Sequence, residues 1–271
     1  MTDLYAVIGS PIAHSKSPRI HAEFAQQTGE DLCYEAIFAA RDGFAEAVAK
    51  FRAAGGRGLN VTVPFKLDAF ALATERTERA EQAGAVNTLK FDDASALGDN
   101  TDGAGLVADL TGRLGFAIRG KRVLIMGAGG AARGVMLPLL RQQPASVTIA
   151  NRTIERARAL ERRFGPFGLV TSGGYAKLAG SSFDLVINAT SAALTGELPP
   201  LPSGIFAPGA FAYDMIYGAD HARFEAHARS DGAARVSDGL GMLVAQAAES
   251  FFLWRGVRPD TRPIIELLRR S

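Results

Sequence analysis

The chain has 271 residues, of which 47% are hydrophobic and 21% are charged, and its formal net charge is +2. This composition is typical of a globular protein long enough for two domains, and it excludes a strongly basic chain that binds nucleic acid. The single cysteine, Cys33, excludes an intrachain disulfide, and no apolar run reaches about 18 residues, so we expect a cytoplasmic protein without a membrane partner. Cys33 lies in an apolar run and is interpreted as a small core residue.

The first hundred residues alternate between strand-like and helix-like segments. Strands are expected at 5–9, 33–40, 58–63 and 86–91, and helices at 17–29, at 42–55 and from residue 64 onward. In the first helix, Ser17 is the expected N-cap, Pro18 the first helical residue and Gly29 the stop. This alternation predicts an α/β layer with largely parallel strands.

A lysine stands in an unusual place in the stretch GLNVTVPFK, residues 58–66. The alternation of apolar and polar residues predicts a strand that stops at Pro64, and this proline suits the first position of a helix. Lys66 then falls in the first helical turn, where the helix dipole disfavours a cation and makes the proton easier to release. The ordinary alternative is a surface lysine.

From residue 103 the pattern changes to helices and fully apolar strands. A helix is expected at 103–115, strands at 183–191 and 211–217, and a last helix at 239–256. Between them, VLIMGAGGAARG contains the G-x-G-x-x-G/A pattern directly after a strand and before a helix. Gly127 allows the tight turn, Gly129 lets a pyrophosphate approach the backbone, and Ala132 permits contact between helix and strand. A glycine-rich turn without a ligand is the weaker alternative. The expected cofactor-binding residues here are Gly127, Ala128, Gly129, Gly130 and Ala131.

The next strand ends in Asn151-Arg152-Thr153, with no acidic residue. An NAD site usually carries Asp or Glu at this point, whereas Arg152 can pair with the 2′-phosphate of NADP. Thr153 is also a candidate N-cap of the following helix, and both roles are compatible. The sequence therefore favours NADP(H) over NAD.

A nicotinamide enzyme that reduces a ketone needs a proton donor, and Lys66 is the strongest candidate. No metal signature is present, and His221 and His227 are interpreted as helix-surface residues. Asp102, in GDNTDGAGL, reads equally well as a helix N-cap or as the carboxylate that orients Lys66. Ser15 and Ser17 are either turn and cap residues or a pair of hydroxyls for a carboxylate near a helix N-terminus.

Nine motifs follow one another in the order seen in shikimate dehydrogenases. They are GSPIAHSKSPRIH, NVTVPFK, GAVNT, GDNTDGAG, GAGGAARG, NRT, INATS, YDMIY and DGLGMLVAQAAESFFLWRG. The chain resembles this family over essentially its whole length. The resemblance implies an α/β fold with a substrate domain at 1–102 plus 239–271 and an inserted Rossmann-type NADP domain at 103–238, with a mainly parallel sheet. It implies the reversible NADPH-dependent reduction of 3-dehydroshikimate to shikimate, by a monomer or a homodimer.

The resemblance also implies roles for individual residues. Ser15 and Ser17 would bind the substrate carboxylate, and Lys66 would be the catalytic acid and base. The substrate hydroxyls would contact Thr62, Asn87, Asp102 and Gln246. Tyr217 would stand at the substrate edge of a cleft between the domains. Met215 and Gly239 would lie against the nicotinamide, and Glu78 would lie on the cofactor side.

The chain departs from the family pattern at two places. Ala22 follows the first-helix histidine where many members have Asn, and Ala222-Arg223 stands where a Thr-Pro pair is frequent. The second departure concerns the loop beside the expected nicotinamide site. Two other functions are compatible with the pattern: a quinate/shikimate dehydrogenase, and a catalytically silent NADP-binding sensor. The silent sensor is disfavoured because both Lys66 and Asp102 are present.

Overall fold

The computed structural model describes residues 2–190 and 197–270 and divides the chain into two compact units. The discontinuous unit contains Met1–Gly105 and Leu243–Ser271, and the continuous unit contains Leu106–Met242. The two boundaries fall inside helices, within α5 (Asp102–Val107) and α9 (Leu240–Arg255). The expected α/β fold class is confirmed. Ser191, the last residue of the INATS motif, lies outside the described residues.

The discontinuous unit is built on a six-stranded sheet with the order β2-β1-β3-β5-β6-β4. Its strands are β1 (Asp3–Gly9), β2 (Leu32–Phe38), β3 (Gly56–Val61), β4 (Glu75–Arg76), β5 (Thr88–Phe91) and β6 (Ala96–Asp99). β1 pairs in parallel with β2 and β3, whereas β5 pairs antiparallel with β3 and β6. β4 pairs in parallel with β6, so the expectation of a largely parallel layer is confirmed, with β5 as the antiparallel strand. The connection between β5 and β6 is too short for a crossover, so the two strands form a hairpin.

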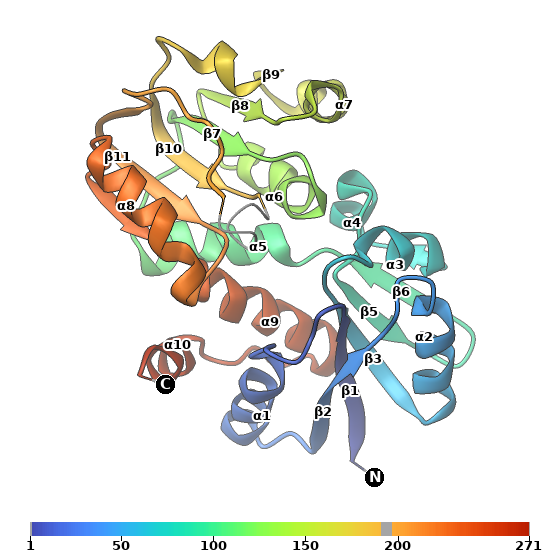
Figure 1. Ribbon diagram of the computed structural model, residues 1–271. Helices are drawn as coiled ribbons and strands as arrows, with labels where there is room; N and C mark the ends of the chain where they lie inside the picture. The colour runs from blue at the N-terminus through green and yellow to red at the C-terminus, as the bar shows by residue number, and fades with distance from the viewer. Residues whose placement is uncertain (1, 191–196, 271) are drawn as a thin grey trace. The chain divides into compact units, whose positions relative to one another are not determined.

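Helices cover both faces of this sheet (Figure 1). They are α1 (Ser17–Thr28), α2 (Phe44–Ala53), α3 (Lys66–Leu72), the short α4 (Glu78–Ala83), α9 and α10 (Arg262–Arg269). Figure 1 shows α1 and the end of α9 on one face, and α2 with α3 on the other. Phe44, Phe51 and Phe65 are buried between α2, α3 and the sheet. No helix was expected after residue 256, although the buried Ile264, Ile265 and Leu268 give α10 an apolar side.

Three local expectations in this unit are corrected. Cys33 is exposed, because burial alternates along β2 and the cysteine faces solvent. The N-cap of α1 is Lys16, so Ser17 is the first helical residue and Pro18 the second. α3 begins at Lys66 with Phe65 as N-cap, so Pro64 precedes the helix rather than opening it. Gly29 does end α1, in the left-handed conformation with φ 72°.

An aromatic cluster lies between α1 and the sheet. His21 is fully buried, and its ring stacks on Tyr34 with centroids 4.1 Å apart. Neither ring nitrogen of His21 has a hydrogen-bond partner among the described atoms. Burial lowers the pKa of His21 to about 3, and the nearby Asn60 side chain opposes this only in part. His21 is therefore neutral in the folded chain.

The neutral His21 predicts acid sensitivity of the fold. An unfolded chain protonates this histidine near pH 6.5, whereas the folded chain does so only near the lowered pKa of about 3. This contribution to the free energy of unfolding is fully present above pH 6.5 and is lost as the pH falls toward 3. At pH 5 the loss is about 2 kcal/mol. The free energy of unfolding, measured with urea, should differ less between pH 7 and pH 5 for His21→Phe than for the wild type. The same substitution at the exposed His14 should keep the wild-type difference, and an unchanged difference in His21→Phe would contradict the assignment.

The continuous unit contains a six-stranded parallel sheet with the order β12-β11-β10-β7-β8-β9. Its strands are β7 (Arg122–Met126), β8 (Ser146–Ala150), β9 (Val170–Gly173), β10 (Phe183–Asn188), β11 (Phe206–Asp214) and β12 (Arg235–Ser237). Read from its first strand, this is the order 3-2-1-4-5-6 of doubly wound nucleotide-binding sheets. In such sheets ligands bind at the carboxyl ends of the strands where the order reverses, which here is between β7 and β10.

Both faces of this parallel sheet are buried. Val123 and Ile125 pack into one apolar cluster, and Leu124 and Met126 pack into another. This two-sided burial explains why β7 is apolar at every residue from Val123 to Met126. The main helical segments are α6 (Gly130–Leu140), α7 (Ile154–Phe164), α8 (Ala222–Ser230) and a π-helical continuation of α5 (Ala108–Arg113); short 3-10 turns lie at Gly165–Phe167, Tyr175–Leu178 and Gly218–His221.

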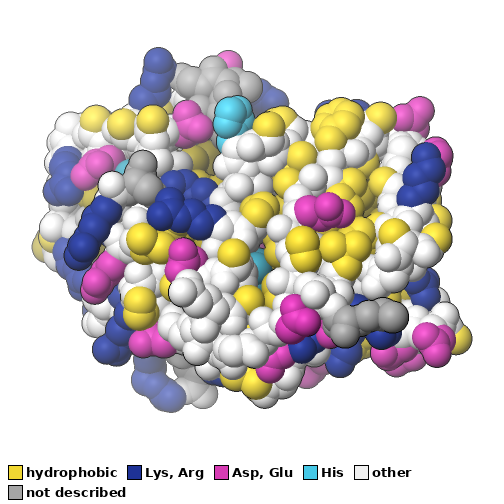
Figure 2. Space-filling view, turned by 90° about the horizontal axis from the view of Figure 1, so that it is seen from below, with side chains coloured by type: hydrophobic (Ala, Val, Ile, Leu, Met, Phe, Trp, Pro, Cys, Tyr) yellow, Lys and Arg dark blue, Asp and Glu magenta, His cyan; other side chains and the backbone are white. Residues whose placement is uncertain are grey.

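Positive and negative side chains are mixed on the surface, as the small net charge of +2 suggests. On the face shown in Figure 2, Lys and Arg side chains are interspersed with Asp and Glu side chains. Across the helices that the structure describes, none is long and apolar enough to span a bilayer.

Candidate active site

Lys66 is fixed by the turn that follows β3. Phe65 is fully buried and stacks on Phe44 with ring centroids 5.1 Å apart, so the residue before the lysine is anchored in the core. The Lys66 carbonyl accepts a hydrogen bond of 2.9 Å from the backbone N–H of Val86. Lys66 is the first residue of α3, the end of the helix at which a cation needs a compensating charge.

Asp102 supplies that charge. Lys66 Nζ donates to Asp102 Oδ2 at 2.5 Å, and the two side chains are only 16% and 8% exposed. Asp102 is the first residue of α5, rather than the residue that caps it. A carboxylate is favoured at that end of a helix, so the helix supports the ionised form that pairs with the lysine.

Asn87 and Gln246 join the same cluster. Asn87 Nδ2 donates to Asp102 Oδ1 at 2.9 Å, and its Oδ1 accepts from the backbone N–H of Thr101 at 2.8 Å. Gln246, on α9, places Oε1 3.4 Å from Asn87 Nδ2 and donates through Nε2 to the Leu243 carbonyl at 2.8 Å. The structure thus brings Lys66, Asn87, Asp102 and Gln246 together.

A second layer of polar residues supports this cluster and was not identified from the sequence. Asn60 Nδ2 donates to Ser250 Oγ at 2.9 Å and to Thr88 Oγ1 at 3.1 Å. Ser250 Oγ also lies 3.3 Å from Thr101 Oγ1, and Thr101 accepts from Asn87 Nδ2 at 2.8 Å. All of these polar side chains are buried. Polar residues within NVTV, VNT and DNTD were the available signal, because buried polar groups need partners.

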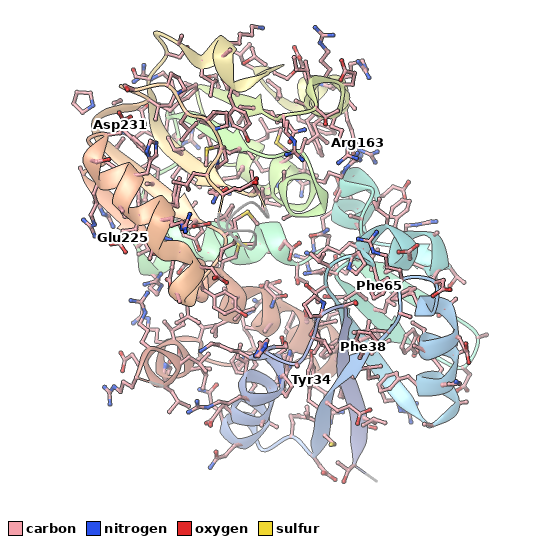
Figure 3. All side chains as sticks on the ribbon, viewed as in Figure 1. Tyr34, Phe38, Phe65, Arg163, Glu225 and Asp231 are labelled. Carbon is pink, nitrogen blue, oxygen red and sulfur yellow. The ribbon has the colours of Figure 1, made fainter. Side chains whose placement is uncertain are left out.

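Ser15 and Ser17 lie at the start of α1. The Ser17 backbone N–H donates to Ser15 Oγ at 3.3 Å, and Ser17 is buried. Figure 3 labels Tyr34 on β2 beside α1, and its hydroxyl donates to Asn60 Oδ1 at 2.7 Å. Burial holds the pKa of Tyr34 well above 10, and the Ser17 side chain partly opposes this. Tyr34 is therefore connected to the Asn87 region through Asn60, whose Nδ2 donates to the Asn87 carbonyl at 3.4 Å.

Two other predicted residues of this unit lie outside the cluster of hydrogen bonds. Thr62 follows β3 and is half-buried, and no side-chain hydrogen bond joins it to the described residues. Its methyl group would lie 2.5 Å from a Cβ added at Gly9, so a glycine is needed there. Glu78 is the first residue of α4 and is exposed in the discontinuous unit.

The glycine loop of the continuous unit has the geometry that a nucleotide requires. Gly127 has φ 103°, and a Cβ there would lie 2.9 Å from the Ala189 carbonyl oxygen. Gly129 is the N-cap of α6, and nothing lies within 4 Å of the position where its Cβ would be. Ala132 is fully buried. The first N–H groups of α6, which include those of Gly130 and Ala131, are available to a phosphate at this helix end.

Asn151, Arg152 and Thr153 follow β8, the strand next to β7. Asn151 Nδ2 donates to the Thr153 carbonyl at 2.8 Å, and Thr153 is the N-cap of α7 without a side-chain capping bond. Arg152 is exposed. Burial raises the pKa of Tyr175 to about 12, and the positive charge of Arg152 opposes this.

Met215, Tyr217 and Gly239 lie after β11 and β12. The Gly239 N–H donates to the Ile216 carbonyl at 2.9 Å, and a Cβ at Gly239 would lie 2.4 Å from the Met215 carbonyl oxygen. Tyr217 is half-buried, and burial raises the pKa of its hydroxyl. Gly239 is thus required by the close approach of the 215–217 backbone.

The cluster in the discontinuous unit can exchange a proton with a bound hydroxyl or carbonyl group. Lys66 is a donor held by a carboxylate, and the amides of Asn87 and Gln246 lie next to that carboxylate. The glycine loop and Arg152 offer groups for phosphates in the continuous unit. Together these are the components of a nucleotide-dependent oxidoreductase for a small hydroxylated substrate.

Three family models match the chain. The "Shikimate dehydrogenase substrate binding domain" matches residues 7–89, "Shikimate / quinate 5-dehydrogenase" matches 110–195, and "Shikimate 5'-dehydrogenase C-terminal domain" matches 239–269. The shikimate dehydrogenase (NADP(+)) of Nitrosospira multiformis is 62% identical over 271 residues, which cover 100% of this chain and 98% of that protein.

Solved structures agree with these matches. An Ael1 enzyme from Pseudomonas putida is 50% identical with a TM-score of 0.92, and the match covers 98% of each chain. Shikimate 5-dehydrogenase from Thermus thermophilus, in complex with NADP(H) and shikimate, is 33% identical with a TM-score of 0.87, and the match covers 99% of each chain.

Proposed function

The chain belongs to the shikimate dehydrogenase family, and from this premise we propose that it reversibly reduces 3-dehydroshikimate to shikimate with NADPH, in the route to aromatic amino acids. The observation that carries the proposal is the Lys66–Asp102 pair beside Asn87 and Gln246, in a chain that also has the glycine loop. We assign the substrate to the discontinuous unit and NADP to the continuous unit. The single cysteine supports a reducing, cytoplasmic setting.

The residues of the continuous unit fit NADP. The pyrophosphate would be held by Gly127, Ala128, Gly129, Gly130 and Ala131. No atom lies within 4 Å of the Cβ position at Gly129, and this residue leads into the N-terminus of α6. Asn151, Arg152 and Thr153 would hold the adenosine ribose and its 2′-phosphate, with Arg152 as the cation. Met215 and Gly239 would lie against the nicotinamide, and Glu78 is a further, weaker candidate on the cofactor side. When bound, NADPH supplies the hydride.

The residues of the discontinuous unit would bind the substrate and move its proton. Ser15 and Ser17 would hold the carboxylate, and Thr62, Asn87, Asp102 and Gln246 would contact the hydroxyls, with Tyr217 beside the substrate. Lys66 Nζ would donate a proton to the carbonyl oxygen during reduction and, once neutral, accept it during oxidation. Asp102 would orient the ammonium group and stabilise its charge, since it lies at 2.5 Å.

Initial-rate kinetics test the activity. Shikimate and quinate should each be combined with NADP and with NAD, and the highest kcat/KM is expected for shikimate with NADP. A chain that oxidises quinate equally well would be a quinate/shikimate dehydrogenase. A chain that binds NADP but turns over neither substrate would be a silent sensor, and this would overturn the proposal.

Arg152 is expected to select NADP. Arg152→Ala removes the partner of the 2′-phosphate, and one charge-assisted contact is worth about 1.5–3 kcal/mol. The KM for NADP should therefore rise about 10- to 150-fold, while the KM for NAD stays nearly constant. The matched control is Arg162→Ala, at an exposed arginine on the helix α7 that follows Arg152, and it should leave both constants unchanged. Equal effects of Arg152→Ala on the two cofactors would refute this role.

Ser15 and Ser17 are expected to act on the substrate alone. Replacing both with Ala removes two hydrogen bonds to the charged carboxylate, and the KM for shikimate should rise at least tenfold. The Kd for NADP, measured by calorimetry without substrate, should not change, because the two serines belong to the other unit. A weaker Kd for NADP would show that the division of ligands between the units is wrong.

A further inference from the structure

Asp214, the last residue of β11, is a fully buried carboxylate. Its Oδ1 accepts from Asn188 Nδ2 and from the backbone N–H of Ile216, each at 3.1 Å. Its Oδ2 lies 3.2 Å from His221 Nδ1. A buried carboxylate is costly unless every oxygen has a partner, so these contacts form one connected group.

The partners of Asp214 hold two loops at the carboxyl end of the parallel sheet. Asn188 ends β10, and its Oδ1 accepts from the Thr190 N–H at 3.1 Å. The Ala189 carbonyl between them lies 2.9 Å from the position of a Cβ on Gly127, the first glycine of the nucleotide loop. The Met215 N–H donates to the Asn188 carbonyl at 3.0 Å. Asp214 thus links the loop beside Gly127 to residues 215–217, here called the 215–217 segment.

His221 closes the other end of this segment. It ends the 3-10 turn Gly218–His221 directly before α8, and its side chain is only 10% exposed. This corrects the expectation of a helix-surface histidine. His221 Nε2 lies 3.8 Å from Glu225 Oε2 on α8, the glutamate labelled in Figure 3. The ring therefore stands between two carboxylates, and only its Nδ1 is within hydrogen-bond distance of Asp214.

An apolar contact also holds the start of α8 to the sheet, because Phe224 is fully buried in the same cluster as Ala210 and Ala212 of β11. His221 is the N-cap residue of α8, and its side chain makes no capping bond to that helix. Ala222 and Arg223 stand where the family frequently has Thr-Pro, and alanine cannot cap a helix through its side chain. The His221–Asp214 contact is a polar side-chain contact that joins the start of α8 to the end of β11.

We propose that His221, acting through Asp214, is a positioning residue for the reaction, because it holds the 215–217 segment in place. The proposal rests on the proposed function, which puts Met215 against the nicotinamide and Tyr217 beside the substrate. Loosening this segment lowers kcat more than it weakens NADP binding, because the phosphates are held by the glycine loop and Arg152. Rate depends steeply on the alignment of the reacting groups.

Two conservative variants test which ring nitrogen matters. In His221→Asn the amide nitrogen takes the place of Nδ1 and can still donate to Asp214, whereas in His221→Gln it takes the place of Nε2 and points toward Glu225. His221→Gln should lower kcat about tenfold with less than a threefold change in the KM for NADP. His221→Asn should keep kcat within about threefold of the wild type. Glu225→Gln is the control and should leave kcat unchanged.

Hydrogen–deuterium exchange of residues 215–221 gives a readout that does not need catalysis. Exchange should be about tenfold faster in His221→Gln than in the wild type, and His221→Asn should restore protection. Equal loss of kcat in both variants, or unchanged exchange in His221→Gln, would overturn the proposal. If the wild type does not oxidise shikimate, the proposed function fails, while the exchange rates still decide whether His221 holds the segment.

Discussion

Lys66→Ala should lower kcat for shikimate oxidation by about 10²- to 10⁴-fold, the usual share of general acid–base catalysis. The KM for shikimate should change little, because the hydroxyls and the carboxylate of the substrate keep their other proposed partners. An interaction made chiefly in the transition state lowers kcat and kcat/KM together. The measurement is steady-state kinetics at saturating NADP.

The control for this variant is Lys50→Ala. Lys50 is 75% exposed on α2 and pairs with Glu46 of the same helix, so its loss should leave kcat unchanged. Thermal unfolding of Lys66→Ala should accompany the kinetics, because Asp102 loses the cation that compensates it. If folded Lys66→Ala keeps nearly full kcat, Lys66 is not the group that transfers the proton.

The sheet of the continuous unit was predictable from local sequence. Val123–Met126 is apolar at every position because both faces of β7 are buried, and Gly127 must adopt a positive φ. Both requirements can be recognised in the sequence, as a run of apolar residues and as a glycine directly after it. The mixed sheet of the other unit was not predictable in this way, because the direction of β5 depends on its pairing with β3 and β6.

The candidate site shows the same contrast. Lys66 was identified because a lysine at the start of a helix violates a local preference. Asn60 was missed, since its partner Ser250 lies 190 residues away in the sequence. His221 was interpreted as a surface residue because nothing in GADHARF reveals the buried carboxylate of Asp214. Such contacts exist only in the folded chain, so spacing along the sequence does not predict them.

Asp102→Asn should lower kcat and also raise the KM for shikimate. The carboxylate holds Lys66 Nζ at 2.5 Å through Oδ2 and accepts from Asn87 Nδ2 at 2.9 Å through Oδ1. An asparagine keeps the shape but removes the charge, and it places an amide NH₂ group against one of these two donors. Loss of a charge-assisted hydrogen bond costs about 1.5–3 kcal/mol, so we expect kcat to fall about 10- to 150-fold. The KM should rise because one proposed hydrogen bond to a substrate hydroxyl weakens.

A double-mutant cycle on kcat decides whether Lys66 and Asp102 act as one unit. If Asp102 acts by orienting Lys66, its removal has little left to affect once the lysine is gone. The double variant should therefore be about as slow as Lys66→Ala alone, and the two effects should be far from additive. Arg152→Ala combined with Lys66→Ala is the matched comparison, and its effects on kcat/KM should be additive because the two residues lie in different units. Additive losses for Lys66 and Asp102 would mean that the carboxylate acts on the substrate independently, and that the 2.5 Å contact is not what makes the lysine an effective proton donor.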